Sequence, residues 1–222
     1  MQAIFQDRFD AGRQLAQRLS HVPNRAATRI LALPRGGVPV AFEVAQALHL
    51  PLEVFVVRKL GLPGREELAM GALAPGGIRL LDRDLIRSFH ISDEALAAVC
   101  EREQVELARR EREYGIQPLP PLKGETILFI DDGLATGSTM LAAIRAVRQL
   151  QPDRIVVAVP VAAPETASFF RSIVEEFIVL YTPEPFRAVG AWYVDFSQTT
   201  DSEVHSLLEQ ASRNYALQGG SS

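Results

Sequence analysis

A run of thirteen residues, 127–139, constrains the fold more than any other part of the sequence. It begins with four apolar residues, which suit a central parallel strand covered on both faces. Two acids follow, Asp131 and Asp132, and then a glycine-containing loop whose last residues suit the opening of a helix. The run therefore predicts half of a βαβ unit, with an acidic pair at the carboxyl end of its strand.

The acidic pair stands where ligands collect in open α/β sheets, beyond the carboxyl ends of the strands. Behind it, successive backbone N–H groups and three hydroxyls can surround one phosphate at a helix N-terminus. The residues of this predicted phosphate loop are Ala135, Thr136, Gly137, Ser138 and Thr139. The pattern favours a sugar-phosphate site, although two acids after a strand can also simply begin a turn.

Other phosphate and nucleotide motifs fit this run less well. A Walker A loop requires a lysine beside Ser138, and because none is present, hydrolysis of a triphosphate is disfavoured. A phosphatase of the haloacid dehalogenase type places its two aspartates two residues apart. Here Asp131 and Asp132 are adjacent, so they point in opposite directions on an extended chain. No Gly-x-Gly-x-x-Gly fingerprint of a dinucleotide site opens a helix in the sequence.

Residues 127–139 resemble the motif with which type I phosphoribosyltransferases bind phosphoribosyl pyrophosphate (PRPP). The resemblance implies that Asp131 and Asp132 hydrogen-bond the 2- and 3-hydroxyls of the ribose and that 135–139 hold the 5-phosphate. It also implies Mg²⁺ as a cofactor, held mainly by PRPP, with the two aspartates as the protein groups that could contact it. Ala135 stands where 6-oxopurine enzymes carry aspartate, which argues weakly against hypoxanthine or guanine as the acceptor.

A second glycine turn follows another predicted strand. Residues 29–33 lead to Pro34-Arg35-Gly36-Gly37, and a helix is predicted over 40–48. Gly36 and Gly37 let the backbone approach a ligand closely, and Arg35 adds a positive charge beside their N–H groups. The turn takes the place of the family's pyrophosphate loop, and the alternative is a tight turn with a solvated arginine.

The next predicted strand, 52–57, delivers Arg58 and Lys59 to the same edge of the sheet. We interpret these cations as a second contact to the diphosphate, with a solvated strand end as the alternative. Residues 61–67 are rich in turn formers and charge and predict a mobile loop, followed by short strands at 68–74 and 76–81. By the resemblance, this flap, 61–81, closes over the reacting centre and excludes water.

Residues 92–114 predict a long, charged helix within an insertion at 83–116. Pairs at i,i+4, such as Glu106 with Arg110, can support such a helix in solvent. Its apolar seam is thin and consists of Leu96, Val99, Glu103 and Leu107. The helix is expected to be a surface helix, with a homodimer contact or a cover over the site as alternatives.

Further strands are predicted at 154–160 and 177–181, with a helix at 164–173 between them. The segment that follows, 182–200, is similar to the hood of purine phosphoribosyltransferases. A base needs a flat apolar surface and a polar partner for its edge. The candidates for this base pocket are Phe186, Trp192 and Asp195. Packing in the core is the alternative for the two aromatic residues.

Bulk properties narrow the class of protein. A length of 222 residues suits one domain, 1–222, with a sizeable insertion. A net charge of −4, with 23 basic and 27 acidic residues, predicts no nucleic-acid partner and no anionic membrane surface. A single cysteine, Cys100, and the absence of a signal-peptide pattern at 1–8 predict a cytoplasmic protein. An amphipathic helix is predicted at 5–20, without chemistry of its own.

The alternation of strands and helices predicts an α/β fold with a doubly wound, mainly parallel sheet. With the resemblance, it predicts a Mg²⁺-dependent phosphoribosyltransferase that acts on PRPP and a nitrogenous acceptor, expected to be a nucleobase. The catalytic group is Asp131 and Asp132 on the ribose and Arg35 and Lys59 on the departing pyrophosphate. The alternatives are a PRPP or nucleotide sensor of the same fold, and a phosphatase with Asp131 as its nucleophile.

Overall fold

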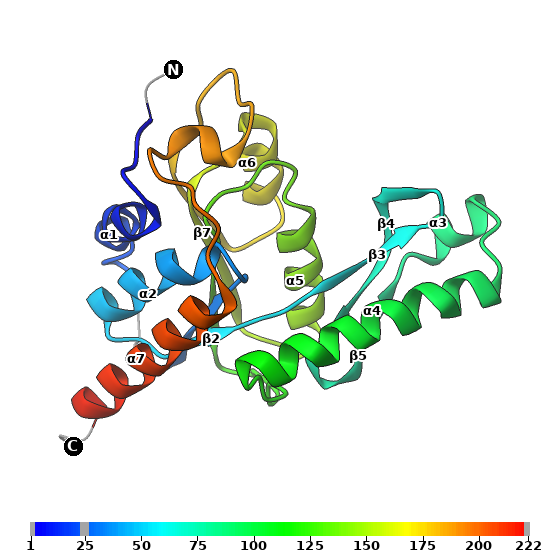
Figure 1. The fold of residues 1–222 in the computed structure, drawn as a ribbon, viewed down its shortest axis with the longest axis horizontal. Helices are drawn as coiled ribbons and strands as arrows, with labels where there is room; N and C mark the ends of the chain where they lie inside the picture. Colours follow the sequence, from blue (N-terminus) through cyan, green and yellow to red (C-terminus); the bar gives the residue numbers. More distant parts are fainter. Residues whose placement is uncertain (1–2, 23–26, 220–222) are drawn as a thin grey trace. The chain divides into compact units, whose positions relative to one another are not determined.

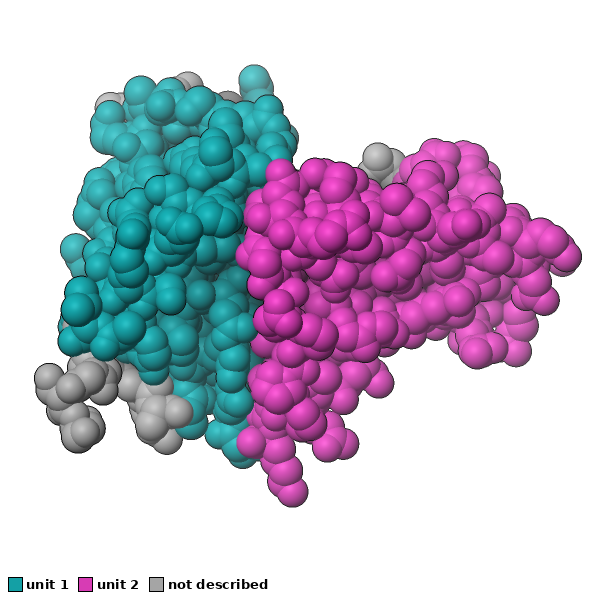
Figure 2. Space-filling model, turned by 60° about the horizontal axis from the view of Figure 1, so that its bottom comes forward, with its two compact units in different colours: residues 1–54, 124–137, 152–222 teal, residues 55–123, 138–151 magenta. Residues whose placement is uncertain are grey.

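The computed structural model describes residues 3–22 and 27–219. Residues 1 and 2, the start of the 1–8 segment considered above, lie outside this range. The chain forms two compact units, coloured separately in Figure 2. Unit 1 comprises residues 1–54, 124–137 and 152–222, and unit 2 comprises 55–123 and 138–151. The expected flap and helical insertion both belong to unit 2, whereas the expected hood belongs to unit 1.

Unit 1 is built on a parallel, five-stranded sheet in the order β2-β1-β6-β7-β8 (Figure 1). Its strands are β1 Thr28–Ala32, β2 Leu52–Val54, β6 Thr126–Ile130, β7 Arg154–Val161 and β8 Glu176–Tyr181. The four apolar side chains before the acidic pair are fully buried in β6, the middle strand, because both of its edges are paired and both of its faces are covered. The predicted parallel α/β sheet is confirmed.

Four α-helices of unit 1 flank this sheet. They are α1 Arg8–Arg18, α2 Gly37–Leu48, α6 Pro164–Arg171 and α7 Asp201–Gly219. Helices α1, α2 and α7 lie side by side, with α1 also in contact with β7 and β8, while α6 contacts β8 (Figure 1). The sequence predicted the first three of these helices along the chain but not α7.

Unit 2 contains an antiparallel, three-stranded sheet in the order β3-β4-β5. Its strands are β3 Arg58–Leu62, β4 Arg65–Ala74 and β5 Ile78–Leu81, and its helices are α3 Arg83–Ser88, α4 Asp93–Tyr114 and α5 Ser138–Arg148. Helix α4 packs on β3 and β4, and α5 packs on β4 and β5. The turn predicted around Pro75 is present as a short 3-10 helix between β4 and β5, so the hairpin is confirmed.

Two predicted elements differ in this region. The mobile loop at 61–67 is instead the turn of a second hairpin, in which only Pro63 and Gly64 lie between paired strands. The turn-forming residues were identified, but their flanks pair with each other. The strand predicted at 52–57 stops at Val54. Arg58 and Lys59 therefore begin an antiparallel strand and do not end a parallel one, because β3 pairs with β4.

Helix α4 agrees closely with its prediction. The Ser92 side chain accepts the N–H of Ala95 at its start, and Gly115 closes its end with a φ of 63°. The predicted seam is buried, together with Cys100 and Tyr114. Over the described parts of the chain, no helix has the length and apolar character needed to cross a membrane.

Candidate functional site

The acidic pair lies at the carboxyl end of β6, between the ends of β1 and β7. Asp131 and Asp132 are both partly buried. The backbone N–H of Asp132 donates to Asp131 Oδ1 at 2.8 Å, which turns the first carboxylate back over the chain. Both carboxylates therefore lie close together at the carboxyl end of the middle strand, where a ligand of an open α/β sheet is expected.

Asp132 is held by two residues that the sequence analysis did not identify. Arg8 Nε, from the first turn of α1, donates to Asp132 Oδ2 at 2.8 Å, and the Tyr193 hydroxyl donates to the backbone oxygen of Asp132 at 2.6 Å. Both partners are distant in sequence, at separations of 124 and 61 residues. No local pattern marks such contacts. The only sequence signal was the aromatic character of the hood.

Burial dominates the electrostatics of the acidic pair. Removal from water raises the pKa of Asp131 well above its usual range, and the charge of Asp132 raises it further. Burial also raises the pKa of Asp132, against the opposing influence of the Arg8 guanidinium. Burial and the charge of Asp132 raise the pKa of Tyr193, so its hydroxyl stays protonated and remains a donor.

The predicted phosphate loop begins beside the end of β7. Leu134 forms a parallel bridge with Ala162, and Thr166 Oγ1 donates to the backbone oxygen of Ala135 at 2.5 Å. Gly137 has a φ of 68°, and a Cβ there would lie 2.4 Å from the Phe170 ring. Glycine is thus required twice over at this position.

The loop ends at the start of a helix, as expected. Ser138 is the first residue of α5, and Thr139 the second. Ala135, Thr136 and Thr139 are exposed, Ser138 is partly buried, and Gly137 is buried. A helix N-terminus preceded by exposed loop residues is an arrangement that suits an anion.

The second glycine turn lies directly against the acidic pair. A Cβ on Gly36 would be 2.0 Å from Asp132 Oδ2, and a Cβ on Gly37 would be 2.7 Å from the backbone oxygen of Ile130. The peptide bond between Pro34 and Arg35 is cis. The structure therefore brings the predicted pyrophosphate turn and the predicted ribose-binding pair together within unit 1.

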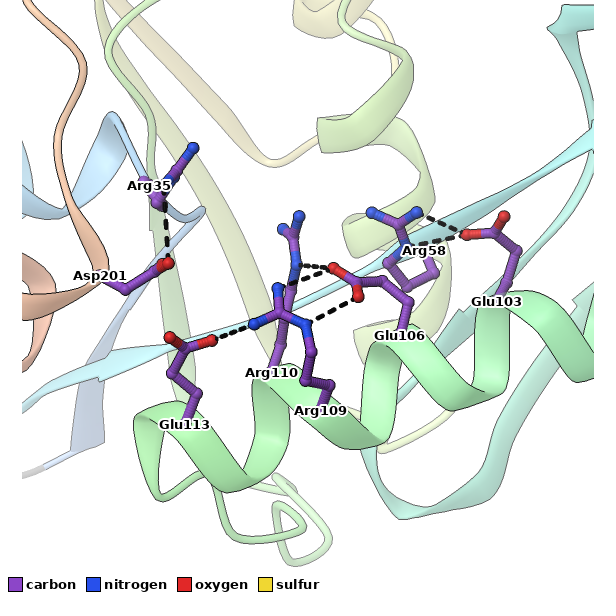
Figure 3. Close-up of polar contacts among 8 residues, drawn as sticks. All are labelled: Arg35, Arg58, Glu103, Glu106, Arg109, Arg110, Glu113 and Asp201. Atoms are coloured by element: carbon purple, nitrogen blue, oxygen red, sulfur yellow. Dashed lines mark hydrogen bonds and ion pairs between the residues drawn. The ribbon is translucent and has the colours of Figure 1, made fainter.

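The predicted pyrophosphate cations have acidic neighbours (Figure 3). In unit 1, Arg35 Nη1 lies 3.6 Å from Asp201 Oδ2, at the first residue of α7. In unit 2, Arg58 donates through Nε and Nη2 to Glu103 Oε2 at 2.9 and 2.6 Å. Lys59 lies opposite Ala72 in the β3–β4 pairing. Arg58 and Lys59 thus form part of the antiparallel sheet of unit 2.

The hood residues have mixed surroundings. Trp192 is 6% exposed and belongs to a buried cluster with Phe5 and Tyr193, and Phe186 packs against the same cluster. The structure gives both predicted base-pocket rings a packing role in unit 1. Asp195 is exposed, and its side chain accepts the Ser197 N–H at 2.8 Å, a bond that lowers the pKa of Asp195.

Known proteins resemble this chain over most of its length. The sequence model of the phosphoribosyl transferase domain family matches residues 2–179. The protein Rv0571c of Mycobacterium tuberculosis H37Rv, provisionally named a phosphoribosyl transferase, is 45% identical over 217 residues. The aligned part is 97% of this chain and 49% of that protein, so the chain spans about half the length of the curated relatives it matches.

Solved structures are also similar to this chain. TT1426 from Thermus thermophilus is 41% identical with a TM-score of 0.81, over 93% of this chain and 98% of that one. AQ2163 from Aquifex aeolicus has a TM-score of 0.51 at 14% identity, over 90% of this chain and 84% of that one. The second similarity is one of fold alone.

Proposed function

The chain belongs to the phosphoribosyl transferase domain family, and on that premise we propose that it transfers the 5-phosphoribosyl group of PRPP to a nitrogenous acceptor with release of pyrophosphate. The observation that carries the proposal is the packing of the Gly36-Gly37 turn against the partly buried pair Asp131 and Asp132. Two neighbouring groups of PRPP, its ribose and its pyrophosphate, require this kind of adjacency.

The proposed reaction needs no covalent intermediate. The bond between ribose C1 and the pyrophosphate oxygen breaks, and the oxygen keeps the electron pair. A nitrogen lone pair of the acceptor forms the new bond to C1, and a proton leaves that nitrogen. In this scheme Asp131 and Asp132 accept hydrogen bonds from the ribose hydroxyls, 135–139 bind the 5-phosphate, and Arg35 neutralises the pyrophosphate. Roles for Arg58 and Lys59 stay predictions.

Mg²⁺ is part of the proposal. Carboxylate oxygens are suitable Mg²⁺ ligands, so Asp131 and Asp132 are the residues that would contribute. In the described portion of the chain, no cluster of three or more His, Cys, Asp or Glu side chains could hold a metal ion. We propose that PRPP oxygens hold most of the coordination sphere of the ion. When bound, Mg²⁺ would neutralise charge on the departing pyrophosphate.

A nucleobase is the acceptor that we propose. The hood contains aromatic side chains, although Trp192 and Phe186 pack in a buried cluster. By the resemblance, the exposed Ala135 stands where 6-oxopurine enzymes carry aspartate, which supports an acceptor other than hypoxanthine or guanine.

One observation favours a second function, a regulator that binds PRPP or a nucleotide without turnover. Arg35 lies near Asp201, and Arg58 is bonded to Glu103, so two cations that the enzyme would need are paired with acids. A sensor of nucleotides alone binds no pyrophosphate, and these pairs would then be structural.

The test is release of pyrophosphate from PRPP with Mg²⁺, measured with a panel of purine and pyrimidine bases. We expect base-dependent release that the double variant Asp131→Asn/Asp132→Asn loses. Asp84→Asn is a control, since that side chain is 89% exposed on α3 and should leave release unchanged. PRPP binding without release for every base would support the sensor. Absence of PRPP binding would refute the enzyme and a sensor of PRPP.

A further inference from the structure

Arg8 is the point at which the N-terminal helix, the hood and the acidic pair meet in unit 1. Its Nε donates to Asp132 Oδ2 at 2.8 Å, and its Nη1 donates to the backbone oxygen of Ser197 at 2.7 Å. The guanidinium carbon lies 3.9 Å from the centroid of the Phe196 ring, within cation–π range. Only 11% of the Arg8 side chain is exposed. It is therefore held on three sides, unlike a solvated surface arginine.

The backbone that carries Arg8 is fixed to the hood. Phe5 and Tyr193 form an isolated parallel bridge. The N–H of Val194 donates to the backbone oxygen of Phe5, and the N–H of Asp195 to that of Gln6, each at 2.8 Å. The Phe5 ring is fully buried in the cluster beneath this pairing. The start of α1 and the hood thus form one packed layer, and Arg8 extends from it to Asp132.

Asp132 has little room to turn away from Arg8. The Gly36 backbone lies so close that a Cβ there would be 2.0 Å from Asp132 Oδ2 and 3.2 Å from Arg8 Nε. The Tyr193 hydroxyl also holds the backbone oxygen of Asp132. A carboxylate offers about four lone-pair sites, so acceptance from Arg8 leaves capacity for a hydroxyl donor.

We infer that Arg8 is a positioning residue of the PRPP site, which orients the Asp132 carboxylate for a ribose hydroxyl and links that orientation to the hood. The inference rests on the proposed function. An arginine stays protonated, so its charge-assisted bond to the carboxylate persists and fixes one oxygen while the other meets the sugar. The same side chain holds Ser197 and Phe196, so the order of the hood and the geometry of the ribose contact depend on one residue.

The experiment compares binding of two ligands by calorimetry in Mg²⁺ buffer. PRPP contains the ribose that Asp132 would contact, whereas inorganic pyrophosphate does not. The variants are Arg8→Gln, which removes the charge, and Arg8→Lys, which keeps a charged donor. Arg13→Gln is the matched control, because Arg13 lies on the same helix with a 55% exposed side chain and an acidic partner, Glu43.

For Arg8→Gln we expect PRPP affinity to fall by about tenfold or more, the size expected for one hydrogen bond to a charged group. Pyrophosphate affinity should stay near the wild-type value. Arg8→Lys should recover part of the loss, and Arg13→Gln should match wild type. In turnover assays the loss should appear mainly as a higher KM for PRPP.

The inference is overturned by an unchanged PRPP affinity in Arg8→Gln. It is also overturned if PRPP and pyrophosphate weaken equally and Arg8→Lys restores nothing, since that pattern indicates a general loss of structure. If wild type itself does not bind PRPP, the proposed function fails, and Arg8 has no PRPP site to position. These results are distinguishable because wild type and each variant are measured with the same two ligands.

Discussion

Gly36 lies so close to the acidic pair that there is no space for a Cβ atom at this position. Its φ is −63°, a value that any residue adopts, so its backbone conformation does not require glycine. What requires glycine is space, because the Asp132 carboxylate occupies the place where a Cβ would stand. The sequence analysis predicted that this glycine allows a ligand to approach the backbone closely. In the structure, the group that approaches it is the Asp132 carboxylate.

Gly36→Ala is therefore expected to displace Asp132 or the turn and to weaken PRPP binding by about tenfold, the cost of roughly one charged hydrogen bond. Titration calorimetry with PRPP measures this. Gly124→Ala is the control, since Gly124 has a φ of 86° and open space around it, at the far end of β6 from the aspartates. It should lower the melting temperature through strain but leave PRPP affinity intact. Normal PRPP affinity in Gly36→Ala would contradict the packing argument.

Tyr193→Phe tests the second contact to Asp132. The ring is 5% exposed, and its hydroxyl donates to a backbone oxygen at 2.6 Å. Without that donor, a buried acceptor loses its partner, which is expected to lower the free energy of unfolding by about 1–2 kcal/mol. Urea denaturation measures the change. The control is Tyr215→Phe, at an exposed position on α7, which should leave the free energy of unfolding unchanged. If both variants change the free energy of unfolding equally, the Tyr193 hydrogen bond does not stabilise the fold.

At the scale of elements, β6 and α4 could be predicted because local pattern and burial agree. The apolar run of β6 is fully buried, the seam of α4 is buried as predicted, and the helix bounds agree with the predicted 92–114. The 61–67 segment could not, because turn-forming residues do not reveal whether their flanks pair. Helix α7 was missed although Val204, Leu207 and Ala211 recur at helical spacing and are buried, since polar residues dominate the segment.

Some residues of the candidate site could be identified from the sequence, and others could not. Asp131, Asp132 and the two glycine turns were identifiable because each lies within a contiguous motif after a strand. Arg8 and Tyr193 were not, because their contacts to Asp132 join distant parts of the chain. Only the fold brings them together, through the pairing of the N-terminal segment with the hood.

Helix α4 carries a charge network whose pH dependence can be predicted. Glu106 bonds to Arg109 and Arg110, and Arg109 also reaches Glu113 (Figure 3). Hydrogen bonds from Arg109 and Arg110 lower the pKa of Glu106 to about 2. The lowered pKa stabilises the folded state above pH of about 4.5, and this contribution is lost as the pH falls towards about 2.

Glu106→Gln should remove that contribution. Because the network is solvent-accessible, the loss at pH 7 is expected to be under about 1 kcal/mol, and wild type and variant should converge in stability as the pH approaches 2. Denaturant unfolding at a series of pH values measures it. Glu101→Gln, an exposed position on the same helix, is the control. A difference between wild type and Glu106→Gln that grows towards low pH would have the wrong sign and would refute the account.

At the scale of the whole molecule, the site is expected to oppose stability. The sheet of unit 1 places two adjacent, partly buried carboxylates at the carboxyl end of its middle strand. Desolvation disfavours the charged form of each, and the charge of Asp132 further disfavours that of Asp131. The hydrogen bond from Arg8 offsets part of the desolvation of the Asp132 carboxylate. The backbone N–H of Asp132 does the same for the Asp131 carboxylate. Proteins retain such costs where function requires the charge.

Asp131→Asn should separate stability from function. The folded-state pKa of Asp131 is raised, so wild type loses stability as the pH rises from about 3.8 through that pKa. Asparagine has nearly the same shape and can still accept the N–H of Asp132, but it carries no charge. We expect the free energy of unfolding at pH 7 to rise by about 1 kcal/mol or more while pyrophosphate release from PRPP falls by at least about tenfold.

The control is Asp153→Asn. The Asp153 side chain accepts the Gly124 N–H at the opposite end of the sheet, and this variant should not raise stability. If Asp131→Asn is less stable than wild type at pH 7 but equally active, the carboxylate is a structural group, and the assignment of Asp131 to the ribose is wrong.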